Sequence, residues 1–195
     1  MQHPLEIVPS PHRKRFFFTF LFLTLALFTV FRVLDQPLRT SAAPNGIVSF
    51  ELAGTVQQAD AITDSWKQTS LLPSAVTDRP NLNNVNIPYT FAAFSLGIDY
   101  FFMPLYSFAL AFGTLLAAGR HSGWMKSLGA AAGWGAFAAA FFDAVENYAL
   151  FQILLGANQS CHPAVAAVCA SIKFGLLFFG SVYAAAGGLM PRKSL

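Results

Sequence analysis

Residues 16–33 read FFFTFLFLTLALFTVFRV, a run of eighteen residues in which Arg32 is the single charged side chain. As an α-helix this run is about 27 Å long, close to the ~30 Å thickness of the hydrocarbon core of a bilayer. Phenylalanine and leucine dominate it, and both partition favourably into hydrocarbon. The run therefore predicts a transmembrane helix at residues 16–34.

Three further apolar runs follow, at residues 88–118, 127–157 and 163–189. The first two exceed the length that spans a bilayer, so we expect tilt or helix ends that protrude into the interface. Only 11% of the chain is charged, whereas a soluble domain carries about 25% charged residues. The sequence predicts an all-α membrane protein with four transmembrane helices.

Basic residues predict how these helices are oriented. Seven of the twelve Lys and Arg residues lie in the tail 1–15, in the loop 119–126 and in the tail 190–195, whereas the turn at 158–162 has none. Cytoplasmic segments of membrane proteins carry an excess of Lys and Arg. We therefore expect cytoplasmic N- and C-termini in a bacterial inner membrane, with the lipid bilayer as the first partner.

The beginning of the chain has two interpretations. A cleaved signal peptide also starts with basic residues, and Ser41-Ala42-Ala43 resembles a cleavage site. Its apolar region is usually about 7–15 residues long, which is shorter than the run at 16–33. This length favours an uncleaved anchor helix that contributes no chemistry.

The segment 35–87 is the largest part predicted outside the membrane, on the extracytoplasmic side. Apolar residues at three- and four-residue steps predict an amphipathic helix at about 49–69; they are Leu52, Val56, Ala59, Ile62 and Trp66. The opposite face carries Glu51, Gln57, Gln58, Asp60 and Asp64. A helix lying on a membrane surface is typically rich in Lys and Arg, so the acidic face favours a lid packed over the bundle.

Ionisable residues also occur inside the predicted spans. They are Asp99 in the second, Asp143 and Glu146 in the third, and Lys173 in the fourth. All four lie about 15–20 Å from the outer helix ends at 1.5 Å per residue. We therefore expect one layer near the middle of the bilayer.

Small residues accompany this layer at helical spacing. Gly129, Ala132, Ala136 and Ala139 lead to Asp143, and Gly180 and Gly187 continue the face of Lys173. Small residues allow helix backbones to approach closely in lipid. The charged side chains should therefore face helix–helix interfaces.

Burial of charge limits what the layer can do. A charge at the bilayer centre costs about 2.5 kcal/mol or more, and Lys173 balances only one of three carboxylates. The layer must therefore hold a proton, bind a cation or bind a ligand, or else form a structural network. The candidate binding residues are Asp99, Tyr100, Tyr106, Asp143, Glu146, Asn147 and Lys173.

Several functional classes find no support in the sequence. No histidine lies at this depth, so a bis-His haem and the Glu-x-x-His pairs of di-iron bundles are excluded. A carboxylate-only metal pair stays open but has little support, and no cofactor is indicated. A net charge of +3 with no basic stripe argues against nucleic acid.

Certain short motifs resemble a known group of proteins. They are Phe50-Glu51-Leu52-Ala53-Gly54 with Trp66, Gly97-Ile98-Asp99-Tyr100-Phe101-Phe102 with Tyr106, and Asp143-x-x-Glu146-Asn147. The chain resembles small bacterial four-helix membrane proteins over about residues 49–188. The resemblance implies the topology and groups these residues, but it implies no activity.

Three functional hypotheses follow. The leading one is a membrane protein that binds or conducts a proton, a cation or a small amphiphile such as a lipid, with transport as its weaker form. The second is an accessory subunit that assembles with other membrane subunits or with copies of itself. The third is an intramembrane enzyme whose carboxylates act as acid and base.

Overall fold

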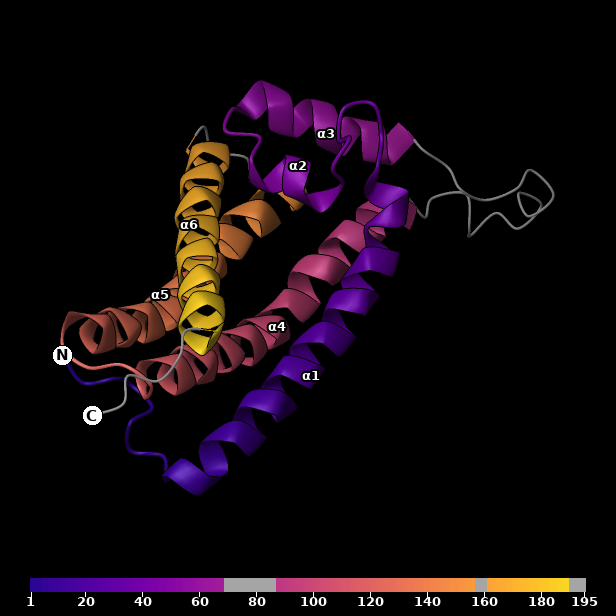
Figure 1. The fold of residues 1–195 in the computed structure, drawn as a ribbon. Coiled ribbons are helices and arrows are strands. Elements are labelled where there is room, and N and C mark those ends of the chain that lie inside the picture. The colour runs from indigo at the N-terminus through magenta and orange to yellow at the C-terminus, as the bar shows by residue number, and fades with distance from the viewer. Residues whose placement is uncertain (69–86, 157–160, 190–195) are drawn as a thin grey trace. The chain divides into compact units, whose positions relative to one another are not determined.

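The computed structural model describes residues 1–68, 87–156 and 161–189. Regular structure within these ranges is helical, with no strand, which confirms the predicted all-α class. The helices in chain order are α1 (Ser10–Leu34), α2 (Ile47–Glu51), α3 (Val56–Gln68), α4 (Ile87–Ala118), α5 (Trp124–Leu154) and α6 (His162–Leu189), with a 3-10 turn at Gln36–Leu38 (Figure 1).

Four of the described helices, α1, α4, α5 and α6, are long and apolar enough to cross a membrane. This confirms the prediction of four helices of spanning length. α1 begins at Ser10, before the predicted start at Phe16, because Pro11 fits the first turn of a helix, where its missing N–H is not needed. α5 ends at Leu154, two residues before Gly156, whose φ of 78° is the left-handed conformation that ends many helices.

Three predicted features lie outside the described residues. They are the end of the segment 35–87 after the amphipathic helix, most of the turn at 158–162, and the basic tail 190–195.

The chain forms two compact units. The first unit comprises Met1–Phe28, Tyr100–Ala144 and Ser171–Leu195, and the second comprises Thr29–Asp99 and Val145–Ala170. Each unit contains part of every spanning helix, because the boundaries between the units fall inside α1, α4, α5 and α6.

The core of the second unit is built around Trp66 of α3. Its indole Nε1 donates a hydrogen bond of 2.8 Å to the carbonyl of Leu38, and its ring packs edge-on against Phe50 at 5.2 Å between centroids. The same hydrophobic cluster includes Leu96 of α4 and Leu150 of α5. α2 and α3 therefore pack against the spanning helices of this unit, as the lid interpretation expects.

The amphipathic segment differs from the single helix predicted at about 49–69. It forms α2 and α3, separated near Gly54, whose φ of 70° is incompatible with a continuing helix. The break changes which side chains are covered. Glu51, predicted on the polar face, is buried, while Leu52, predicted on the apolar face, is 47% exposed.

The first unit is held together by close helix contacts. A Cβ added at Gly129 of α5 would lie 2.7 Å from the Cβ of Ala118 in α4, so only glycine permits this approach. Gly180 of α6 is similarly tight against Leu110 of α4. These contacts confirm that the predicted small residues lie at helix–helix interfaces.

The N-terminal residues pack into the first unit, which the sequence did not predict. His3 is buried, and a Cβ added at Gly133 of α5 would lie 2.2 Å from its Nε2. The Trp134 indole donates a 3.2 Å hydrogen bond to the carbonyl of Gln2, and Lys126 pairs with Glu6 at 3.5 Å. The N-terminal part of the basic tail predicted at residues 1–15 therefore packs into this unit.

Candidate functional site

Asp143 of α5 is the centre of a buried polar group in the first unit. Its Oδ1 lies 3.0 Å from the Nζ of Lys173 in α6, and both side chains are buried. The small residues that precede Asp143 on α5 explain this placement, because they bring the α5 backbone close to its neighbours. Asp143 is thus a carboxylate that pairs with Lys173, which the sequence alone could not identify.

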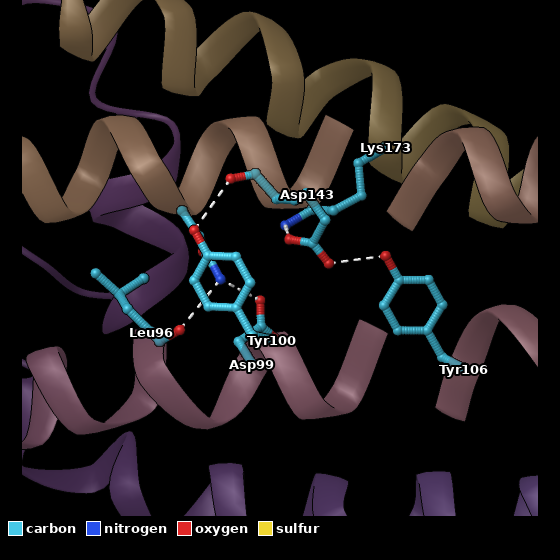
Figure 2. A network of polar contacts seen from close by, with 8 residues as sticks. Leu96, Asp99, Tyr100, Tyr106, Asp143 and Lys173 are labelled. Atoms are coloured by element: carbon cyan, nitrogen blue, oxygen red, sulfur yellow. Dashed lines mark hydrogen bonds and ion pairs between the residues drawn. The ribbon is translucent and has the colours of Figure 1, made fainter. Parts of the chain in front are cut away.

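Tyr106 of α4 completes this group. Its hydroxyl donates a 2.8 Å hydrogen bond to Oδ2 of Asp143, so each carboxylate oxygen has its own donor. Figure 2 shows Lys173 and Tyr106 at the two oxygens of Asp143. We call Tyr106, Asp143 and Lys173 the ion-pair triad.

Apolar side chains surround the triad. Met103 and Ala139 are buried in a cluster with Tyr106, and Leu176 and Leu177 pack against it. The Lys173 Nζ also lies 4.7 Å from the ring centroid of Phe174, within the range of a cation–π contact. An ion pair in such surroundings is stable only while both partners are present.

Tyr100 does not take part in the triad. Its side chain is 44% exposed, and its hydroxyl donates a 3.3 Å hydrogen bond to the backbone carbonyl of Ala144 (Figure 2). The Tyr100 hydroxyl therefore contacts the backbone of α5 in the first unit.

A second polar group lies in the second unit, around Asn147 of α5. The Asn147 Nδ2 donates hydrogen bonds to Oδ2 of Asp99 at 2.8 Å and to the backbone carbonyl of Leu96 at 3.3 Å (Figure 2). Its Oδ1 is buried and receives no hydrogen bond from the described residues. Glu146 precedes Asn147 in the same unit and is fully buried. These three candidates are thus buried or half-buried side chains of the second unit.

A cavity of about 1150 Å³ opens within the first unit. Its walls come from α1, α4 and α6, and most lining side chains are apolar, including Phe17, Leu21 and Leu177. Two lining residues connect the cavity to the ion-pair triad: Tyr106 is a member of it, and the ring of Phe174 contacts Lys173. A molecule in the cavity would therefore lie against side chains that hold Asp143 and Lys173.

The sequence interpretation missed the contribution of α1 to this cavity. The lining residues of α1 are Ser10, Arg13, Lys14, Phe17, Leu21, Thr24 and Phe28. They recur at three- and four-residue steps, which places them along one face of the helix. This spacing was visible in the sequence, but a helix of nearly uniform apolarity gave no reason to prefer one face. α1 therefore forms one wall of the cavity.

Among the described residues, no group of three or more His, Cys, Asp and Glu side chains is arranged to hold a metal ion. No family model, curated protein or solved structure matches the chain. The site must therefore be interpreted from its own geometry.

Proposed function

We propose that this chain is a multi-pass membrane protein that binds an amphiphilic ligand in the cavity of the first unit, beside the ion-pair triad. A volume of about 1150 Å³ is slightly larger than that of most ligand pockets, which measure roughly 300–1,000 Å³. The proposal places the protein in the bacterial inner membrane because of its resemblance to small bacterial membrane proteins. Cytoplasmic termini follow from the distribution of basic residues.

The observation that carries the proposal is the double role of Tyr106 and Phe174. Each lines the cavity, and each contacts a charged member of the triad. Ligand pockets are mostly apolar and hold a few polar groups at defined points. The triad supplies such a point at the wall of an otherwise apolar cavity.

The geometry favours an amphiphile over a cation at the triad. Lys173 offsets the charge of Asp143, and both carboxylate oxygens already accept a hydrogen bond. A second cation would have to displace the ammonium or the hydroxyl. Binding of an uncharged or anionic amphiphile in the cavity leaves the pair intact.

The test compares two neighbouring alanines of α6. Ala185 lines the cavity, whereas Ala186 does not, and both are exposed in the described structure. Ala185→Phe should fill part of the cavity, while Ala186→Phe makes the same change outside it. Each protein is extracted from native membranes in a lipid-retaining polymer, and mass spectrometry quantifies the amphiphiles that accompany it.

We expect wild type and Ala186→Phe to retain the same amphiphile at near one copy per chain, and Ala185→Phe to lose most of it. Equal amounts in all three proteins would overturn the proposal. If stoichiometric protein partners accompany all three and no amphiphile does, the chain is an assembly subunit instead.

A further inference from the structure

We propose that the ligand of this cavity is an anionic phospholipid, with its phosphate at Lys14 and Arg120 and one acyl chain along α1. This inference rests on the proposed function and names the class of ligand. It is carried by the distribution of charge and of apolar surface along the walls of the cavity.

The charged lining residues of the cavity are all cationic. They are Arg13 and Lys14 in the first turns of α1 and Arg120 just after α4. Within the described part of the chain, neither Asp nor Glu lines the cavity. Basic residues near the cytoplasmic leaflet attract anionic lipid headgroups. The positive charge of the part of the cavity lined by Arg13, Lys14 and Arg120 is therefore complementary to a phosphate.

Hydrogen bonds hold two of these cations in place. The guanidinium of Arg120 donates to the carbonyl of Gly188, another lining residue, which keeps it beside the cavity. Arg13 donates to the carbonyls of Val8 at 2.7 Å and Glu6 at 2.9 Å, so it mainly secures the N-terminal segment. Lys14 and Arg120 are exposed, which makes their charges available to a headgroup.

Beyond the cations the α1 wall is mostly apolar. From Lys14 through Phe17 and Leu21 to Phe28 the lining face of α1 extends about 21 Å at 1.5 Å per residue. One leaflet of the hydrocarbon core is about 15 Å thick, so this wall is long enough for one acyl chain. A soluble anion has no need of such a wall, and a neutral lipid has no need of the cations.

The experiment measures lipid selectivity of the full chain in detergent after lipid removal. Phosphatidylglycerol and phosphatidylcholine with identical acyl chains are added at equal concentration, and native mass spectrometry gives the ratio of chains that carry one lipid of each kind. Lys14→Gln and Arg120→Gln are compared with Arg15→Gln, which removes an adjacent exposed charge that does not line the cavity.

We expect wild type and Arg15→Gln to prefer phosphatidylglycerol by about tenfold, on the order of 1.4 kcal/mol. Lys14→Gln and Arg120→Gln should each reduce this preference several-fold. High salt should reduce it in the wild type as well, because exposed charges are screened. Inorganic phosphate at matched ionic strength should not displace the lipid.

Other outcomes separate this inference from the proposed function. Equal binding of both lipids by the wild type would overturn the inference that the headgroup is anionic. The same inference fails if Arg15→Gln reduces the preference for phosphatidylglycerol as much as Lys14→Gln and Arg120→Gln do. If Ala185→Phe still abolishes both adducts in that case, the cavity remains a lipid site without headgroup selectivity. If Ala185→Phe leaves phosphatidylglycerol binding intact, the cavity is not the site and the proposed function fails too. Displacement by inorganic phosphate alone would make it a site for a soluble anion.

Discussion

The largest buried side chains form one core in the second unit, whereas in the first unit some large apolar side chains line a cavity. Trp66, Phe50 and Leu150 are almost completely covered in the second unit. In the first unit Phe28 and Phe174 line open volume and remain substantially exposed. In lipid an apolar side chain gains little by moving from acyl chains to protein, so such a volume can stay open in a stable bundle. The difference teaches that the second unit is filled by its own side chains, whereas the first unit combines close helix contacts with a volume that can accommodate a ligand.

The polar side chains extend this contrast. In the first unit a charged pair, Asp143 and Lys173, is embedded among apolar residues beside the cavity. In the second unit the Asn147 amide links Asp99 to the backbone of Leu96. The first arrangement includes a pair of opposite charges, and in the second an amide donates to a carboxylate and to a backbone carbonyl.

The largest expected effect comes from breaking the buried pair. Lys173→Met leaves Asp143 buried without its ammonium, and loss of one partner of a buried pair costs about 3–5 kcal/mol. Adding Asp143→Leu should recover at least half of this loss, because the isolated charge is then removed. Chemical unfolding of the wild type, the two single variants and the double variant in one lipid mixture gives the coupling free energy between Lys173 and Asp143.

Lys126→Met is the control for this cycle. Lys126 pairs with Glu6 at 3.5 Å, but both side chains are solvent-accessible, and an exposed pair of this kind contributes about 0.2–1 kcal/mol. Additive losses for Lys173→Met and Asp143→Leu would contradict a mutually dependent pair in the first unit.

A smaller effect is expected from the N-terminal segment as the pH falls. Burial is the main cause that lowers the pKa of His3 from 6.5 to about 4; Glu6 opposes the shift and Arg13 adds to it. The His3 Nδ1 accepts the N–H of Leu5 at 3.2 Å, so Nε2 carries the proton and donates to Thr114 Oγ1 at 3.1 Å. A proton on Nδ1 would point at the N–H of Leu5, so this hydrogen bond would be replaced by repulsion between two donors.

The sign of the pH dependence follows from these pKa values. An undocked His3 takes up a proton below about pH 6.5, whereas the docked His3 stays neutral until about pH 4. Docking should therefore be complete near pH 7 and weaken as the pH falls from 6.5 to about 4. Hydrogen exchange of residues 1–8, corrected for intrinsic rates, measures this change.

Two substitutions provide the comparison for the pH effect. His3→Gln keeps a donor for Thr114 and should remove the pH dependence above the acid range in which Glu6 takes up a proton, while His12→Gln changes an exposed histidine and should preserve it. A pH response that survives in His3→Gln would show that another group controls docking of the segment.

Much of the fold could be predicted because it depends on local pattern. Four apolar runs of spanning length gave the helices, and small residues at helical spacing marked the close contacts at Gly129 and Gly180. The break between α2 and α3 was missed because the apolar steps continue across Gly54, whose left-handed backbone no periodicity shows. Cytoplasmic termini and the single layer of ionisable residues stay predictions.

The site was predictable only in part, for a physical reason. The cost of burying charge identified Asp143 and Lys173 as residues that need a partner. It could not say which carboxylate faces Lys173, because that depends on how the helices are rotated against each other. The cavity and the docking of His3 depend on contacts between segments distant in the chain, and their sequence carries no local signal of these contacts.

The smallest expected effect compares one substitution in both units. Ala166 and Ala185 both lie in α6, so an alanine-to-leucine change alters helix propensity equally at the two positions. Ala166 is fully buried in the core of the second unit, where added volume should cost about 1–3 kcal/mol. Ala185 faces the cavity, where a leucine has room and should change the free energy of unfolding by less than about 0.5 kcal/mol. Chemical unfolding in a common lipid mixture measures both, and equal losses would mean that the first unit is as tightly packed as the second, so that a ligand could enter only if the helices moved apart.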